Sequence, residues 1–362
     1  MREIGSEFWL NNIPNEYIED LPYWLNVGDD RQFLLSGRTA IDFVLEDISQ
    51  DISCVYMPSY CCESILQPFV DKEIHIEFYD VVISDKGIKY IIDDKKDCDI
   101  FFAISYFGFS CTAMDEIIEA FSKRKIIVIE DITHRLLSEQ LYKNSADYHV
   151  ASLRKWFEIP SGGLAVKSNG KFSKTNLTDT KIVETKICAM RKKADYINFQ
   201  KGNKDEYLNT FASFNKALQQ DYKDKKMDYL SKQIMFALDI SEIKKRRKNN
   251  AKILYKSLGA SIDKIGKFIK PLIAQYDIHN DCPLFFPIRV RADLRKPLRD
   301  FLTLNKIYCP IHWPIAKNLC LNERTRQIYD EELSLICDHR YGENEMLRII
   351  NTIKVFFEGI EK

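Results

Sequence analysis

The chain has 362 residues, of which 45% are hydrophobic and 29% charged, and its 53 basic side chains equal its 53 acidic ones in number. This length predicts about two domains, or one large domain with an appendage. A zero formal net charge gives no overall field that would favour nucleic acid or an anionic membrane as a partner. No apolar run approaches the ~20 residues of a membrane span, and the acidic N-terminus is unlike an export signal. We therefore expect a soluble, cytoplasmic protein.

The ten cysteines form no CxxC pair, and several of them fall within apolar, strand-like runs. A structural zinc site needs paired ligands at short spacing, and a disulfide framework is typical of small secreted chains. Neither pattern is present. We therefore expect no metal site, and most of the thiols to be reduced and buried.

Strand and helix patterns alternate through the first half of the chain. After Ser36-Gly37, the apolar residues Ile41, Val44 and Leu45 have helical spacing. Strands are expected at Ser53–Met57, Ile74–Tyr79, Asp99–Ser105, Lys125–Glu130, Tyr148–Leu153 and Gly163–Lys167. Continuous apolar runs such as IIVIE are typical of buried parallel strands. The alternation predicts an α/β fold with a mostly parallel sheet sandwiched by helices.

The rest of the chain predicts an arm and a second, smaller domain. Residues 168–235 are lysine-rich and helical, and the KKRRK run at 244–248 is interpreted as a solvated helix face, because it lacks the interleaved aromatic residues of a nucleic-acid groove. The C-terminal segments predict a small α/β domain. We divide the chain into an N-terminal arm (1–30), a large domain (31–235) and a small C-terminal domain (236–362).

Polar side chains follow the ends of three expected strands: Asp131, Tyr106, and the pair Ser152 and Lys155. Ligands of open α/β sheets bind outside the carboxyl ends of the strands, so these side chains are expected to share one site. A separate anion site is expected at the turn of Ser36 to Arg38, where a helix begins with free N–H groups and a positive dipole end.

Lys155 is the residue around which the site is interpreted. Its apolar neighbours Trp156, Phe157 and Pro160 favour partial desolvation of its amine. Desolvation lowers the pKa of a lysine, as a lysine that forms a Schiff base requires. The alternative interpretation is a surface lysine beside a pair of core aromatic residues.

The combination of groups indicates which cofactor fits. The chain has neither a GxxxxGK[ST] loop nor a dinucleotide glycine fingerprint. A lysine, a strand-end carboxylate and a helix N-terminus remain, and pyridoxal 5'-phosphate uses this set. The lysine carries the aldehyde, the carboxylate keeps the pyridine nitrogen protonated, and the helix end takes the phosphate.

The sequence resembles the DegT/DnrJ/EryC1/StrS family of sugar aminotransferases, which have fold type I of the pyridoxal-phosphate enzymes. The likeness covers nearly the whole chain, through SGRTA, PSYCCESI, SYFG, IEDITH, SLRKWFEIPSGG, YCPIHWP and the final helix. The resemblance implies that Lys155 is the Schiff-base lysine, with Gly162-Gly163 at the family's distance after it. It also implies that Asp131 pairs with the pyridinium and that His134 lies near the ring hydroxyl.

The same resemblance assigns the remaining site residues. The backbone amides of Arg38 and Thr39, in the turn at Gly37, and the hydroxyl of Ser152 would hold the phosphate. The family-like C-terminal segments offer His312, Trp313, Arg340 and Tyr341 as substrate contacts, with ordinary loop packing as the alternative.

Three features depart from the family pattern. The lysine comes three positions after the serine, where the family usually has five. The ring-stacking aromatic position falls on Cys62, which cannot stack, so Tyr60, Tyr106 or Phe107 is expected to cover the ring. The asparagine-arginine segment that the neighbouring subunit lends is not recognisable in 195–235.

The resemblance implies an aminotransferase that moves an amino group from an amino acid, glutamate, to a nucleotide-linked keto-sugar in surface polysaccharide or glycan precursor biosynthesis. It also implies a homodimer, because the family builds each site from two subunits. Two alternatives remain open. One is a pyridoxal-phosphate enzyme of another reaction type, a dehydratase or lyase, although Lys155 argues against the dehydratases that carry histidine there. The other is a non-catalytic descendant that binds or regulates.

Overall fold

The computed structural model describes residues 2–11, 13, 19–138, 144–174, 176–273, 275–316, 319 and 321–360. Parts of the expected arm (1, 12 and 14–18) and Cys320 therefore lie outside the described residues. The other nine cysteines are free thiols, as the sequence predicted, and seven of them are buried or half-buried. None of the helices in the described ranges is long and apolar enough to cross a bilayer.

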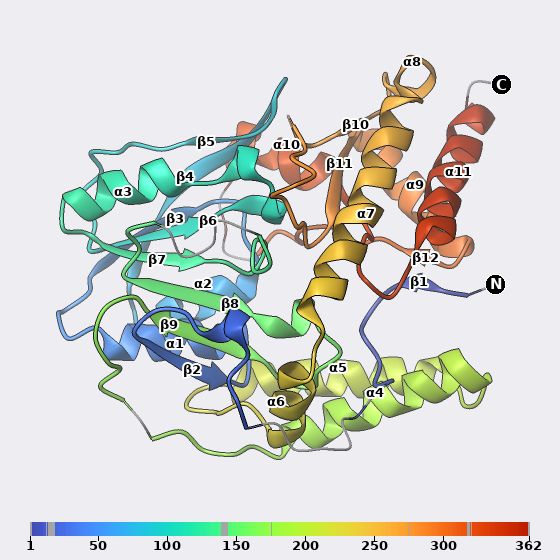
Figure 1. Ribbon diagram of the computed structural model, residues 1–362. Coiled ribbons are helices and arrows are strands. Elements are labelled where there is room, and N and C mark those ends of the chain that lie inside the picture. Colours follow the sequence, from blue (N-terminus) through green and yellow to red (C-terminus); the bar gives the residue numbers. More distant parts are fainter. Residues whose placement is uncertain are drawn as a thin grey trace.

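The core of the molecule is an eight-stranded sheet (Figure 1). Its strands are β2 (Asp30–Leu34), β3 (Cys54–Pro58), β4 (His75–Ser84), β5 (Gly87–Ile91), β6 (Ile100–Ile104), β7 (Ile127–Asp131), β8 (Tyr148–Ser152) and β9 (Gly163–Lys167), in the spatial order β2-β9-β8-β7-β6-β3-β4-β5. Strands β4, β3, β6, β7 and β8 are parallel neighbours, and antiparallel pairs form only toward the two edges. The predicted α/β class and mostly parallel sheet are confirmed.

Helices connect and cover the strands. They are α1 (Gly37–Asp47), α2 (Glu63–Val70), α3 (Asp115–Lys123), α4 (Ile182–Phe199), α5 (Lys204–Gln220), α6 (Tyr229–Phe236), α7 (Ile240–Gly259), α8 (Ile262–Ile265), α9 (Ala292–Leu304), α10 (Glu323–Glu331) and α11 (Glu343–Ile360). Short 3-10 turns are η1 (Tyr23–Leu25), η2 (Tyr106–Gly108), η3 (Ser110–Thr112) and η4 (Leu153–Lys155).

Both faces of the sheet are buried. In β8 and β9, neighbouring side chains belong alternately to two different apolar cores. Val150 and Ala165 belong to the apolar core that includes α1, whereas Ala151, Leu164 and Val166 belong to the core that includes α4 to α7. Successive strand residues point to opposite faces. The near-continuous apolar sequence of these strands therefore reflects helices on both sides.

A second, smaller sheet lies in the C-terminal part of the chain. Strands β10 (Ile269–Pro271), β11 (Phe286–Val290) and β13 (Glu332–Leu335) pair antiparallel. Strand β1 (Ile4–Gly5) pairs parallel with β12 (Ile307–Tyr308), so the start of the expected arm contacts this C-terminal part, next to α11 in Figure 1. The boundaries at residues 30 and 235 stay predictions.

A close backbone approach fixes the first turn of α1 against the ends of β8 and β9. Ser36 caps the helix, because its hydroxyl accepts the N–H of Thr39. A Cβ atom on Gly163 would lie 2.0 Å from the carbonyl oxygen of Ser36, and one on Gly37 would lie 3.0 Å from Cβ of Ser152. Only glycine allows the helix to begin this near to the strand ends.

Replacing Gly163 by alanine tests this approach. We expect Gly163→Ala to lower the free energy of unfolding by ~1–3 kcal/mol, because the added methyl group must push the backbone at Ser36 away. Chemical denaturation measures the change. Gly259→Ala is the matched control, since no atom lies within 4 Å of that position. Equal stability of the Gly163→Ala variant and the wild type would contradict the contact.

Candidate active site

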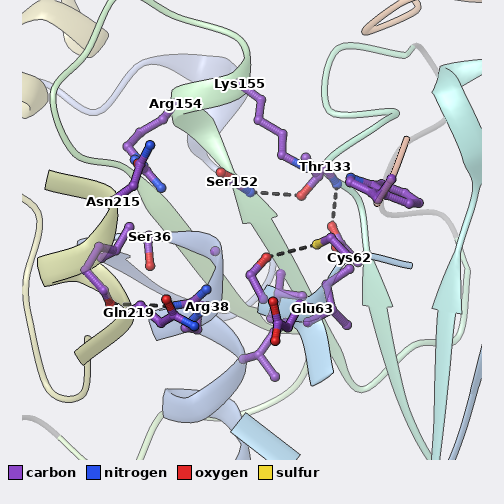
Figure 2. Close-up of a pocket in the computed structure, with 18 of the residues that line it drawn as sticks. Ser36, Arg38, Cys62, Glu63, Thr133, Ser152, Arg154, Lys155, Asn215 and Gln219 are labelled. Carbon is purple, nitrogen blue, oxygen red and sulfur yellow. Dashed lines mark hydrogen bonds between the residues drawn. The ribbon is translucent and has the colours of Figure 1, made fainter. Parts of the chain in front are cut away.

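A cavity of about 590 Å³ opens beside the first turn of α1, at the carboxyl ends of β7 and β8 (Figure 2). Six of the expected site residues line it: Gly37, Arg38, Cys62, Asp131, Ser152 and Lys155. Trp313, expected as a substrate contact, lines it as well. The structure thus brings the expected lysine, carboxylate and helix N-terminus together on one side of the sheet.

Lys155 ends the 3-10 turn that follows β8 and is half-buried. Figure 2 shows its side chain extending toward Thr133. Its Nζ atom lies 5.9 Å from the centroid of the Trp313 ring. The amine therefore has an aromatic ring on one side and the end of β7 on the other. In the part of the chain that the structure describes, no carboxylate forms an ion pair with it.

Asp131 and Glu130 are adjacent buried carboxylates on opposite faces of β7, and their surroundings differ sharply. Glu130 forms an ion pair at 3.2 Å with Arg135, and its other carboxylate oxygen lies 3.2 Å from Nδ1 of His149. Although burial acts to raise it, these partners hold the pKa of Glu130 below its usual range. Asp131 accepts a 2.8 Å hydrogen bond from the backbone of Thr133. Burial raises the pKa of Asp131, and Thr133 and the charge of Lys155 offset this only in part.

The structure corrects one expected phosphate contact. The N–H group of Thr39 already donates to the Ser36 hydroxyl, and the Thr39 side chain is buried against the same oxygen at 2.9 Å. Thr39 does not line the cavity. Because a helix cap uses one of the orphan amides, the N–H groups of Gly37 and Arg38 are the ones left for an anion.

The rings expected to cover the cofactor lie elsewhere. Tyr60, Tyr106 and Phe107 are fully buried, and none of them lines the cavity. The Tyr106 hydroxyl donates to the Tyr60 carbonyl, and the Tyr60 ring packs edge-on to Tyr329 at 4.9 Å. These aromatic side chains pack against one another in the core, away from the cavity lining. Trp313 is the aromatic residue on the cavity wall.

His134 is also buried and lies behind the lining rather than in it. Its ring stacks between Phe107, at 5.1 Å, and Trp313, at 5.7 Å. Its Nδ1 atom accepts the N–H of Phe107 at 3.1 Å. Burial lowers the pKa of His134, and electrostatic interactions with Lys155 and His312 lower it further. His134 is therefore neutral, with its proton on Nε2, and supports the position of the Trp313 ring.

A second cavity of about 510 Å³ shares Arg154, Lys155 and Trp313 with the first. His312 and Arg340 line it too. The His312 Nδ1 atom lies 2.9 Å from the Ser334 hydroxyl. The second cavity therefore opens on the same lysine and the same ring as the first.

Arg340 and Tyr341 hold the N-terminal segment to the C-terminal part of the chain. Arg340 pairs with Asp338 at 2.8 Å and donates to the carbonyl of Ser6. The Tyr341 hydroxyl accepts the N–H of Gly5 at 2.9 Å, and Tyr341 lines neither cavity. These contacts give both residues a role in packing. Arg340 also lines the second cavity, and its expected contact with the substrate stays a prediction.

Sequence reasoning did not find six polar residues of the first cavity: Glu63, Ser64, Thr133, Arg154, Asn215 and Gln219. The only local signal was the position of Arg154 next to Lys155. Consecutive residues of a 3-10 turn point ~120° apart, and in Figure 2 the Arg154 side chain extends away from Lys155, toward Asn215 and Ser36. Asn215 and Gln219 come from α5, whose register no motif indicates.

One carboxylate group elsewhere has the spacing of a metal site. Oxygen atoms of Asp42, Glu46 and Asp224 lie within 4.8 Å of one another. Lys72 pairs with Asp42 and Glu46, and Lys174 pairs with Glu46 and Asp224. The positive charges of these two lysines reduce the repulsion among the three carboxylates.

The contrast between the two carboxylates of β7 is testable without any ligand. A raised pKa in the folded state means that ionised Asp131 destabilises the protein above that pKa, so Asp131→Asn should raise the free energy of unfolding at pH 7, on the order of 1 kcal/mol. The gain should shrink as the pH falls through the raised pKa. Thermal melts of the protein without added ligand, recorded across pH, measure it.

Glu130→Gln is the matched control and should act in the opposite direction. Ionised Glu130 has a lowered pKa and stabilises the fold at neutral pH, and this contribution is lost only as the pH falls through the lowered value. Breaking the buried pairs should therefore cost about 3 kcal/mol at pH 7. The same sign of change for both variants would contradict the assigned surroundings.

No family model matches this sequence, and no curated protein matches it. The fold resembles that of solved aminotransferases. Helicobacter pylori PseC, an aminotransferase involved in the biosynthesis of pseudoaminic acid, superposes with a TM-score of 0.66 at 14% identity over 99% of this chain and 100% of that one. NtdA from Bacillus subtilis with bound PMP gives a TM-score of 0.62 at 15% identity, covering 91% of this chain and 74% of that one. The PLP form of the putative sugar aminotransferase Spr1654 from Streptococcus pneumoniae gives 0.62 at 16% identity, covering 92% and 88%. The chain therefore has the fold of these aminotransferases.

Proposed function

We propose that this chain is a pyridoxal-phosphate-dependent aminotransferase of the DegT/DnrJ/EryC1/StrS family. It transfers an amino group from an amino acid, glutamate, to a nucleotide-linked keto-sugar for surface polysaccharide or glycan precursors. The observation that carries this proposal is that Lys155 and the buried, weakly partnered Asp131 line one cavity at the N-terminus of α1. The solved structures with the same fold that are described as bound to PLP or PMP support it.

The described residues fit this cofactor at both of its charged ends. Asp131 is a buried carboxylate whose pKa is raised by burial, so a protonated pyridine nitrogen beside it would relieve the cost of its charge. The amides of Gly37 and Arg38 and the dipole of α1 suit a phosphate. Lys155 supplies the amine.

Each residue then has a definite task. Pyridoxal phosphate, when bound, supplies an aldehyde that exchanges amines and a ring that accepts an electron pair from the carbon next to the amine. Asp131 holds the proton on the ring nitrogen by its negative charge. Lys155 Nζ would take the α-proton of the amino acid as a general base and, as a general acid, deliver it to the carbon that carried the cofactor's aldehyde oxygen. Trp313, on the wall of both cavities, excludes water from the amine.

The second cavity suits the two substrates. It reaches Lys155 and is also lined by the cationic side chains Arg247, Arg299 and Arg340. Both the carboxylate of an amino acid and the phosphates of a nucleotide-linked sugar are anionic, so one cationic cavity serves the two half-reactions in turn. A homodimer, which the family resemblance implies, and a cytoplasmic location, which the sequence predicts, belong to this proposal.

The cofactor assignment predicts a coloured protein. We expect wild-type protein with added pyridoxal phosphate to show a visible absorbance band, and borohydride to fix the cofactor mass on the peptide that contains Lys155. Lys155→Arg keeps the positive charge but offers no amine for the carbonyl, so it should show neither effect. A wild-type protein that stays colourless with added pyridoxal phosphate would contradict the assignment and favour a non-catalytic binding protein.

The reaction type has its own test. Glutamate should bleach the visible band of the wild type and release 2-oxoglutarate in amounts equal to the cofactor, because one amino group moves per site. A panel of nucleotide-linked keto-sugars, read by mass, should then identify the acceptor. A protein that binds the cofactor but is not bleached by glutamate or another amino acid would point to a dehydratase or lyase.

A further inference from the structure

Two arginines on the wall of the first cavity lack the partners that buried arginines normally have. The Nε atoms of Arg38 and Arg154 are buried, and neither has a hydrogen-bond partner among the described residues. No ion pair to either guanidinium occurs in the described part of the chain. The Arg38 Nη1 atom donates a long, 3.4 Å bond to the carbonyl of Leu218, and Arg154 lies over the ring of Phe214, 5.5 Å from its centroid.

Acidic groups act on both arginines, but none forms an ion pair with either of them in the described part of the chain. Glu63, which also lines the cavity, and Asp71 raise the pKa of Arg38, after Cys62 and Tyr222. Glu7, the acid that acts on Arg154, forms its own ion pair with Lys186 at 2.7 Å. Burial lowers the pKa of both arginines, and the positive charge of Arg38 lowers that of Arg154 further. Two like charges that lie close together in a cavity repel each other, and an anion between them would remove that repulsion.

The position of the arginines indicates which anion. Arg38 belongs to the first turn of α1, and Figure 2 shows Arg154 extending toward Ser36, the cap of the same helix. Lys155 extends in a different direction, toward Thr133. The arginines therefore gather at the helix end of the cavity and not at the reactive amine. Two guanidinium groups and a helix N-terminus match a doubly charged phosphate better than a singly charged carboxylate.

We propose that Arg38 and Arg154 bind the phosphate group of pyridoxal phosphate through their guanidinium groups, together with the amides at the start of α1. This inference rests on the proposed function. It assigns a side-chain role to Arg38, for which only a backbone contact was expected, and a cofactor-binding role to Arg154, for which none was expected. The Leu218 carbonyl and the Phe214 ring orient the two side chains.

The test compares pyridoxal phosphate with pyridoxal, which lacks the phosphate. Dissociation constants are measured by absorbance titration for the wild type, Arg38→Gln, Arg154→Gln and the double variant. Each single variant should weaken binding of pyridoxal phosphate roughly tenfold to a hundredfold, because it removes one charge-assisted contact. Binding of pyridoxal should change less than about twofold. The exposed Arg291→Gln, whose arginine pairs with Asp293 outside both cavities, is the matched control.

A second measurement needs no covalent chemistry. Inorganic phosphate should raise the melting temperature of the wild type and of Arg291→Gln, but not that of the Arg38→Gln/Arg154→Gln double variant, and glutamate at the same ionic strength should not reproduce the effect. If Arg154→Gln does not fold, Arg154→Met takes its place in these measurements, because a methionine keeps an apolar contact with the Phe214 ring but carries no charge.

The outcomes separate the two proposals. Equal weakening of pyridoxal phosphate and pyridoxal would overturn the phosphate assignment and leave the arginines a structural role. If the arginine variants weakened the binding of glutamate but not that of pyridoxal phosphate, the phosphate assignment would be overturned, and the arginines would be assigned to a substrate carboxylate. Stabilisation by phosphate through the two arginines, in a protein that never becomes coloured, would support the anion site and defeat the aminotransferase.

Discussion

The contact between the first turn of α1 and the ends of β8 and β9 determines the rest of the site. Gly163 has no Cβ, so the carbonyl of Ser36 can occupy the space where a side chain would begin. The N-terminus of α1 then lies against Ser152, one short turn from Lys155. A residue with a side chain at position 163 would separate the helix dipole from the amine. The cavity would then lose the combination of an anion site and a reactive lysine.

The charges of the cavity are separated rather than neutralised. Asp131 is buried at one end, and burial raises its pKa, although the charge of Lys155 offsets part of this rise. The two arginines, at the helix end, likewise have no carboxylate partner in the described part of the chain. A protein selected only for stability would pair such groups or replace them with apolar ones. A ligand with a cationic ring nitrogen and an anionic phosphate would compensate both ends at once.

The sequence predicted the sheet well and the cavity wall in part. All six expected strands form, because long apolar runs between turns are a local signal. β2 and β5 were missed, since the short DRQFL and GIKYI runs lie at the edges of the sheet and carry a weak pattern. Lys155 and Asp131 were found because strand ends of a parallel sheet share one edge. Trp313 and Asn215 line the same cavity but come from distant segments of the chain, and no local sequence pattern predicts that these segments fold back to the strand ends.

The choice of aromatic residue shows why spacing alone was insufficient. Tyr60 was one of three aromatic residues expected to cover the cofactor ring in place of Cys62. Cys62 lines the cavity, with its Sγ atom 2.9 Å from the Ser64 hydroxyl, whereas Tyr60 is buried in the core. At the start of α2 the cavity is thus bordered by a small thiol. The ring comes instead from Trp313, which His134 supports from behind by stacking and which also lines the second cavity. Any group that enters the second cavity therefore contacts the same indole that borders the first, and the C-terminal part of the chain links the two cavities physically.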